Sequence, residues 1–207
     1  MKLVDMKVEG YLDILKSDAP APGGGSVSAL AGTQACALVS MVADLTIGKE
    51  KYAAFEEVCR ETKAVMERIY AELFAGIDLD TEAFNMVAAA YKLPKATDDE
   101  KAIRSKAIAE ANIRATEVPY RNMELCLEGL RAMKDMAGRF NPNAASDFGV
   151  AALNFKAGCL GAWLNVKINL PGIKDPEQLK RFENAENIAI EAQTLADELF
   201  EEVSKSL

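Results

Sequence analysis

The residues best suited to chemistry begin with a glycine-rich segment, 19–26, which leads into an apolar stretch. Glycines let a backbone turn tightly and present its N–H groups, and the amino end of a helix adds partial positive charge. Gly23, Gly24, Gly25 and Ser26 are therefore a candidate cradle for a phosphate or carboxylate. The segment lacks the lysine of a nucleotide-binding P-loop. The simpler alternative is a loop in which Ser26 caps the helix.

Carboxylates are the natural candidates for acid–base chemistry, because the chain contains no histidine. This absence removes a Ser-His-Asp triad, the usual zinc sites and the commonest general base. Asp147 stands at the head of an apolar stretch, where burial would raise its pKa and suit it to general acid or base catalysis. Asp80 precedes a further expected helix. For both residues, helix capping is the ordinary alternative.

A third cluster, Asp44–Tyr52, ends an apolar stretch with a glycine and places Lys49 and Tyr52 after it. A lysine at this position commonly offsets the negative end of a helix dipole. That structural role is the favoured interpretation of the cluster when the residues are considered alone.

A fourth cluster ends the second apolar stretch. Asn165 and Asn169 are four residues apart and therefore share a helix face, whereas Lys167 lies on another face. Amides and an ammonium group at the end of a buried helix are costly unless they are hydrogen-bonded or contact a ligand. This cluster is the hardest to explain as scaffold alone.

The elements that position these residues are all expected to be helices, because no segment shows the alternation of a strand. The pattern predicts an all-α fold, a helical bundle of about six to eight helices, in one domain over residues 1–207. Gly76 is expected to end or kink one helix, and Pro119 to kink or restart another. The expected helices cover residues 8–15, 26–47, 50–76, 83–93, 97–138, 145–168 and 175–207.

Composition narrows the class of protein. Half of the residues are hydrophobic, and the net charge of −8 argues against general nucleic-acid binding. The amino terminus does not resemble a signal peptide, and segment 26–43 predicts a buried helix rather than a membrane span. The four cysteines lack metal-site spacing, so we expect reduced thiols in a cytoplasmic protein.

The two apolar helices, 26–47 and 145–168, are too apolar for the surface of a monomer. Either they form the hidden centre of the bundle or one of them pairs across a dimer. The pattern alone leaves both arrangements open.

Six segments, taken in order, resemble the methenyltetrahydrofolate cyclohydrolase and formimidoyltetrahydrofolate cyclodeaminase family, which includes the carboxyl-terminal domain of formiminotransferase-cyclodeaminase. The resemblance covers nearly the whole chain. The family often has Thr at the position of Ala21 and Asn at that of Asp44. The segments are Pro20–Ser26, Leu45–Tyr52, Glu82–Phe84, Ala90–Pro94, Ser146–Gly149 and Leu164–Asn169.

The resemblance implies a homodimer of all-helical subunits with a folate pocket near the subunit interface, and with no metal and no cofactor. It implies either hydrolysis of 5,10-methenyltetrahydrofolate or ring closure of 5-formimidoyltetrahydrofolate with loss of ammonia. Free-standing length favours the cyclohydrolase, and a non-catalytic folate-binding protein is the alternative of another class. Asp147 and Asp80 are the expected catalytic carboxylates. The expected substrate-binding residues are Gly23, Gly24, Gly25, Ser26, Lys49, Tyr52, Lys92, Asn165 and Lys167.

Overall fold

The protein is described by a computed structural model over residues 2–207, and within that range every regular element is a helix. The all-α prediction is therefore confirmed. Short 3-10 segments precede or link the α-helices at Leu3–Asp5, Glu50–Phe55, Pro142–Ala144 and Leu170–Gly172. The α-helices are α1 (Val8–Leu15), α2 (Gly24–Asp44), α3 (Glu56–Tyr91), α4 (Asp98–Met136), α5 (Ala145–Asn169), α6 (Pro176–Lys180) and α7 (Ala185–Ser206).

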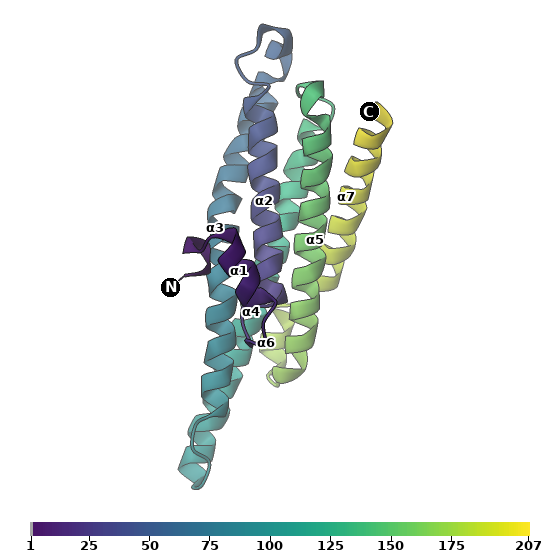
Figure 1. Cartoon of the computed structure of the whole chain (residues 1–207). Helices are drawn as coiled ribbons and strands as arrows, with labels where there is room; N and C mark the ends of the chain where they lie inside the picture. Colours follow the sequence, from purple (N-terminus) through teal and green to yellow (C-terminus); the bar gives the residue numbers. More distant parts are fainter. Residues whose placement is uncertain (1) are drawn as a thin grey trace.

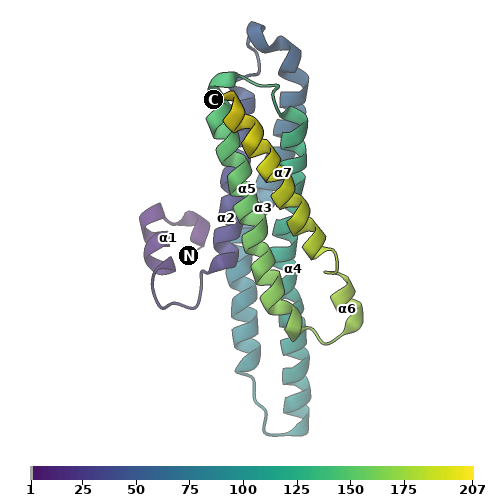
Figure 2. The same cartoon turned by 90° about the vertical axis from the view of Figure 1, so that its right-hand side faces the viewer.

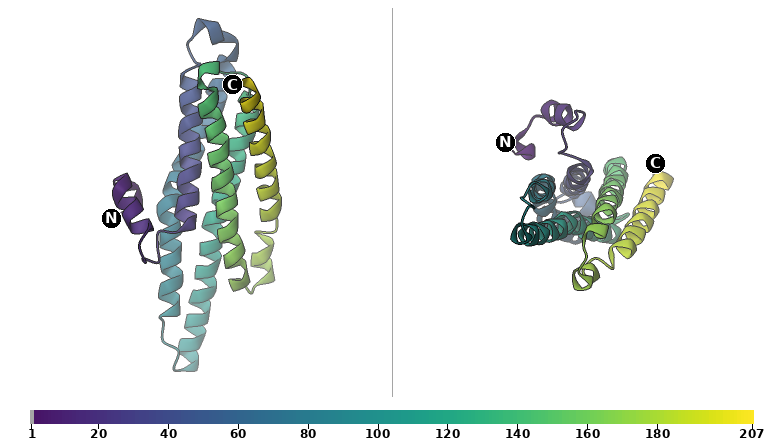
Figure 3. Two further views of the ribbon diagram at one scale, coloured as in Figure 1. Left: turned by 45° about the vertical axis from the view of Figure 1, so that its right-hand side comes forward. Right: turned by 90° about the horizontal axis from the view of Figure 1, so that it is seen from below.

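Four long helices, α2, α3, α4 and α5, run side by side as an elongated bundle (Figure 1). Helix α2 packs against α3 and α5, and α4 packs against the other sides of α3 and α5. Helix α7 covers α4 and α5, while α1 stands at the side of α2 (Figure 2). The α3–α4 hairpin extends beyond the other helices at one end, as the oblique view in Figure 3 also shows.

Small residues allow α2 and α5 to approach closely. A Cβ atom at Gly158 of α5 would lie 2.9 Å from the carbonyl oxygen of Ser28 and 3.1 Å from the backbone nitrogen of Gly32, both on α2. Any larger side chain would push the helices apart. Around this contact the core is filled by large apolar side chains, including Phe148, Phe155, Met66, Ile69, Leu73 and Leu130.

Gly76 and Pro119 lie inside continuous helices, so the helix end expected at Gly76 and the restart expected at Pro119 are wrong. A Cβ at Gly76 would lie 2.7 Å from the Asn122 Oδ1, which shows that the glycine admits a side chain of α4. Pro119 has no N–H for the carbonyl of Ala115 one turn earlier. The Asn169 Nδ2 donates to that carbonyl at 2.8 Å instead. Tertiary contacts thus override the local preference of both residues.

Two helix starts follow their expected signals, but the last helix is interrupted. Thr97 and Glu100 form a reciprocal capping box, and the Asp175 carboxylate accepts the N–H of Glu177 at 2.9 Å. The helix that Asp175 begins ends at Lys180, whereas one helix to the carboxyl terminus was expected. Phe182 in the intervening turn is buried against Tyr120, with 5.3 Å between ring centroids. Burying this ring requires the chain to change direction.

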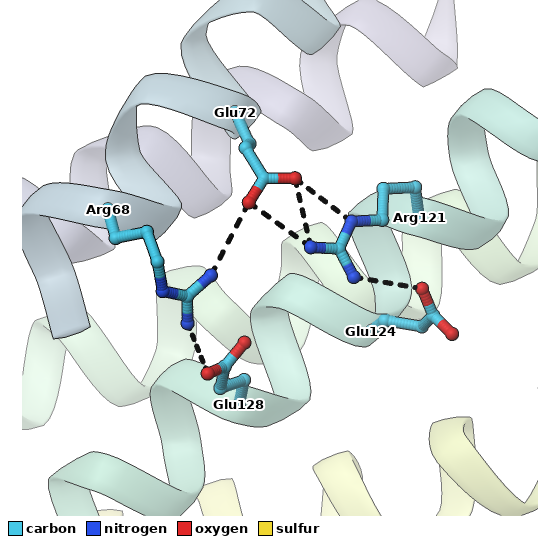
Figure 4. Close-up of polar contacts among 5 residues, drawn as sticks. All are labelled: Arg68, Glu72, Arg121, Glu124 and Glu128. Atoms are coloured by element: carbon cyan, nitrogen blue, oxygen red, sulfur yellow. Dashed lines mark hydrogen bonds and ion pairs between the residues drawn. The ribbon is translucent and has the colours of Figure 1, made fainter.

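Ion pairs join the outer faces of α3 and α4 (Figure 4). Glu72 accepts from Arg121 at 2.9 Å, and Arg68 pairs with Glu128. These side chains are 41–48% exposed. Exposed pairs of this kind contribute about 0–1 kcal/mol each. The pairs therefore contribute less to stability than the buried packing does.

Helix α2 is long and apolar enough to cross a membrane by length and composition, with a mean hydropathy of 1.5. More than half of that stretch is buried inside the bundle, as in the core helix of a soluble protein. The outer sides of α2 and α5 nevertheless remain exposed and apolar. We call this surface the α2–α5 face; its large residues are Val27, Met41, Leu45, Val150, Leu153, Leu164 and Ile168.

Candidate functional site

A pocket of about 340 Å³ opens where the amino end of α2 meets α3, α4 and the last turns of α5. The glycine segment before α2 forms one wall. Apolar side chains from α3 and α5, Phe84, Val87 and Ile168, form another. The polar side chains that line the pocket are Asp80, Asn112, Asn165 and Asn169.

The carboxylate of Asp80 lies against the first turn of α2. A Cβ at Gly25 would lie 1.9 Å from the Asp80 Oδ1, so only glycine leaves room for this carboxylate. The Ser26 hydroxyl lies 3.3 Å from the Asp80 Oδ2. The same hydroxyl donates to the Ile77 carbonyl at 2.8 Å. The anion held at this helix start is thus a side chain of the protein itself.

Burial raises the pKa of the Asp80 carboxyl, and hydrogen bonds from Ser26 partly oppose the rise. A carboxylate with a raised pKa is a stronger base than an exposed one and suits proton transfer near neutral pH. The amino end of α2 contributes partial positive charge beside it. Asp80 therefore has the position and the environment of an acid–base group.

Tyr11 is a neighbour of Asp80 that sequence analysis missed. It is 8% exposed, and its hydroxyl has no hydrogen-bond partner among the described residues. Burial raises the pKa of this phenol, and the charge of Asp80 raises it further. The helical spacing in α1 indicated only an amphipathic helix, so no local signal marked Tyr11 as part of the site.

Asn112 is a second residue that sequence analysis missed. It lies on α4 and lines the pocket opposite Asn165, although the two are far apart in sequence. A polar residue within a long amphipathic helix is ordinary on the exposed face, so its type and spacing carried no signal. Only the packing of α4 against α5 brings it to the pocket.

Other expected site residues lie at the opposite end of the bundle. Asp147 is in the first turn of α5, 18 residues before Asn165, which corresponds to about 27 Å along the helix. Lys49 and Tyr52 follow the end of α2, and the Tyr52 hydroxyl donates to Asn141 at 3.0 Å. Within one chain, these three residues do not share a pocket with Asp80.

The two remaining lysines lie outside the pocket. Lys92 is exposed just after α3, 12 residues beyond Asp80, or about 18 Å along the helix. Lys167 is exposed on α5, and its Nζ lies 5.4 Å from the centroid of the Trp163 ring. The structure thus gathers Gly23, Gly24, Gly25, Ser26, Asp80 and Asn165, and separates the other predicted residues from them.

Comparisons with known proteins agree on one kind of relative. The family model described as formiminotransferase-cyclodeaminase matches residues 7–187. The methenyltetrahydrofolate cyclohydrolase of Methylorubrum extorquens is 40% identical over 97% of both chains. The formimidoyltransferase-cyclodeaminase of Mus musculus is 32% identical over 84% of this chain, which spans about a third (32%) of that relative's length. The crystal structure of formiminotetrahydrofolate cyclodeaminase from Thermotoga maritima superimposes over 98% of this chain with a TM-score of 0.79 and 28% identity.

The contact between Gly25 and Asp80 predicts that alanine at position 25 lowers the stability of the fold, whereas alanine at position 23 does not. Gly25→Ala should destabilise the fold by about 1–3 kcal/mol, because its Cβ overlaps the half-buried Asp80 carboxylate. Gly23→Ala is the matched control, since nothing lies within 4 Å of its Cβ, and should change stability by less than about 0.5 kcal/mol. Urea unfolding of both variants measures the difference. Equal stability would show that the carboxylate does not occupy this space.

The raised pKa of Asp80 predicts a stability that depends on pH. The folded protein binds the Asp80 proton more tightly than the unfolded chain does, so Asp80 costs stability once the pH rises above its unfolded pKa. Asp80→Asn removes this cost. The variant should therefore gain stability relative to wild type as the pH rises from the ordinary Asp range towards neutrality, measured by urea unfolding across that range. A difference that is flat, or of the opposite sign, contradicts the assignment.

Proposed function

Because this chain belongs to the formiminotransferase-cyclodeaminase family, we propose that it hydrolyses 5,10-methenyltetrahydrofolate to 10-formyltetrahydrofolate. The observation that carries the proposal is a half-buried carboxylate, Asp80, in a pocket whose other lining groups are amides, glycines and apolar side chains. The similarity to a cyclohydrolase over 97% of both chains supports this reaction. The relatives that combine two activities are matched over only about a third of their length.

The substrate's reacting carbon lies between two nitrogens of an amidinium cation. Asp80 takes a proton from a water as that water adds to the carbon, and the negative charge of Asp80 faces the cation. The resulting tetrahedral carbon loses its bond to N5, N5 gains a proton, and the hydroxyl proton leaves as the formyl carbonyl forms on N10. One proton is released overall. Gly25 and Ser26 hold the carboxylate in place for this step.

The second candidate reaction is the cyclodeaminase reaction, which the similarity to the Thermotoga maritima enzyme favours. In that reaction N10 attacks the formimidoyl carbon and ammonia leaves. Asp80 would then act as the acid that protonates the leaving nitrogen. Both reactions use the same carboxylate and the same tetrahedral carbon, so one pocket serves either. A non-catalytic folate-binding protein would have no use for a carboxylate whose burial raises its pKa.

We propose that catalysis requires no metal or cofactor and occurs in the cytoplasm. Asp80 supplies the proton transfer, and the chain contains no histidine to supply the commonest metal ligand. The four cysteines are free and buried. Burial raises the pKa of Cys36 and of Cys159 to about 12, which keeps these thiols protonated and unreactive. Unreactive free thiols suit a reducing compartment.

We propose further that the α2–α5 face joins two copies of the chain as a homodimer. In a single chain this face leaves large apolar residues in contact with water, Leu164 at 67% and Ile168 at 78% exposure. A patch of this kind along two whole helices is typical of an interface. The face contains few charges, so a second copy can cover it without burying unpaired ions.

An antiparallel dimer would bring the end of one subunit that holds Asp147 next to the end of the other subunit that holds Asp80. A two-fold axis across the middle of the α2–α5 face places the far end of one subunit beside the pocket of the other. The partner's Asp147, with Lys49 and Tyr52 beside it, would then face Asp80. The partner's Lys49 would also offer a cation to the anionic glutamate tail of the folate, because no Lys or Arg lines the pocket of the single chain.

The proposed reaction predicts that the purified protein consumes 5,10-methenyltetrahydrofolate, measured from its absorbance. Asp80→Asn should lower kcat by roughly a hundredfold or more, since general acid–base groups contribute ~10²–10⁴-fold. Exhaustive chelation should leave the wild-type rate unchanged. Release of ammonia from the formimidoyl substrate with no hydrolysis of the methenyl substrate would replace the first reaction with the second. Activity that disappears with chelator and returns with a divalent ion would contradict the metal-free mechanism.

The antiparallel dimer predicts complementation between two inactive variants. Asp80→Asn and Asp147→Asn should each be inactive alone. When co-expressed, a mixed dimer has one site with both carboxylates intact, so its activity should reach roughly half that of the wild-type dimer. Mixed dimers isolated with two different affinity tags measure this. Inactive mixed dimers would place the two carboxylates in one subunit's site, and full activity of Asp147→Asn alone would remove Asp147 from the mechanism.

A further inference from the structure

Three asparagine side chains line the pocket beside Asp80, one on α4 and two on α5. They are Asn112, Asn165 and Asn169. All three are half-buried. An asparagine amide offers both donors and an acceptor, so the orientation of each amide decides what it presents to a ligand.

Backbone carbonyls fix that orientation in all three. A carbonyl oxygen can only accept, so the amide NH₂ must face it and the Oδ1 must face away. No donor within residues 2–207 is hydrogen-bonded to these Oδ1 atoms. The three Nδ2 contacts are Asn112 to the Gly172 carbonyl at 3.2 Å, Asn165 to the Gly161 carbonyl at 2.9 Å, and Asn169 to the Ala115 carbonyl at 2.8 Å.

Two backbone features hold these contacts in place. A Cβ at Gly172 would lie 2.8 Å from the Asn112 Nδ2, so this glycine admits the amide. Pro119 removes the helical donor that the Ala115 carbonyl would otherwise have, and Asn169 replaces it. Turning over the Asn169 amide would leave that carbonyl without a donor, which is unfavourable. The amide orientations are therefore built into the scaffold.

The pocket is thus rich in acceptor oxygens, although each asparagine NH₂ keeps a second N–H besides the one that it donates to a backbone carbonyl. Asp80 contributes carboxylate oxygens, the three asparagines contribute amide oxygens, and no lysine or arginine lines the pocket. Phe84, Val87 and Ile168 supply apolar surface beside them. The complementary ligand is a flat heterocycle with several N–H donors and no negative charge. An anionic group would meet these oxygen atoms with no cationic side chain in the lining to balance its charge.

We propose that Asn112, Asn165 and Asn169 select the reduced pterin ring by its N–H donors and orient its reacting carbon towards Asp80. This inference rests on the proposed function and names the part of the folate that the pocket binds. A tetrahydropterin presents donors at its 2-amino group, at N3 and at N8. Fully oxidised pterin has no hydrogen on N8, so its N8 would meet an acceptor oxygen with a lone pair.

The test uses calorimetry on the whole protein to measure how much binding affinity is lost when the ligand lacks one of two N–H donors. Tetrahydrofolate is the reference probe, its analogue without the 2-amino group removes one donor, and folic acid removes the N8 hydrogen. Wild type should bind each of the latter two at least about tenfold more weakly, since a site built for a donor discriminates strongly against its absence. Asn112→Ala and Asn165→Ala should each weaken tetrahydrofolate binding, and at least one should reduce one of the two penalties to about twofold.

Asn154→Ala is the matched control. Asn154 lies on the same helix as Asn165 and makes the same kind of bond, from its Nδ2 to the Val150 carbonyl at 2.9 Å, but it lies outside the pocket. It should leave both penalties unchanged. Asn169→Ala is not used, because its amide also stabilises α4. If tetrahydrofolate binds wild type but both variants still bind the two analogues at least about tenfold more weakly than tetrahydrofolate, the asparagines do not select the pterin ring. The proposed reaction would then still stand. If wild type binds no tetrahydrofolate, both proposals fail.

Discussion

The close approach of the Asp80 carboxylate to the first turn of α2 is the contact around which the pocket is organised. It requires a residue without a side chain at position 25, a helix that begins there, and a hydrogen bond from Ser26. Burial alone would make an ionised carboxylate unfavourable at this position. The hydrogen bond and the helix dipole offset part of that cost while leaving the pKa raised. The protein thus keeps a basic carboxylate next to an apolar pocket.

The scaffold of the bundle extends directly into this site. Pro119 would weaken an isolated helix, yet α4 is continuous because Asn169 of α5 donates to the carbonyl that the proline leaves free. The same bond fixes the face that Asn169 presents to the pocket. Gly172 and Gly25 likewise admit polar side chains, Asn112 and Asp80, at distances that a Cβ would forbid. Stability and recognition therefore depend on the same contacts between helices.

The polar residues of the family segments are divided between the two ends of the bundle. Residues 20–26 and Asp147 belong to segments with the same family resemblance, but they lie at opposite ends of antiparallel helices. The α2–α5 face that runs between these ends is apolar and exposed. A second copy packed there in the opposite direction would join the two ends without any change in either fold.

The elements that depend on local interactions could be predicted from the order of the residues alone. Helical periodicity predicted the all-α fold, and the Thr97–Glu100 capping box marked the start of α4, because both depend on residues within a few positions of one another. The ordered motifs also identified the family and placed Gly25, Asp80 and Asn165 among the candidate residues. The types of these residues carried the signal, since few structural roles demand them together.

Which of those residues meet depends on how the helices pack against one another. Gly76 and Pro119 predict breaks when each is considered locally, but packing against Asn122 and the bond from Asn169 keep both helices continuous. Tyr11 reaches Asp80, and Asn112 reaches the pocket, through contacts between distant segments that no spacing encodes. Asp147 and Asp80 are both carboxylates that were expected at helix starts. In the structure Asp147 lies at one end of the bundle and Asp80 lies near the other, with about 27 Å of helix between the two ends. A distance of that kind is set by how helices pack, which residue type and sequence spacing do not specify.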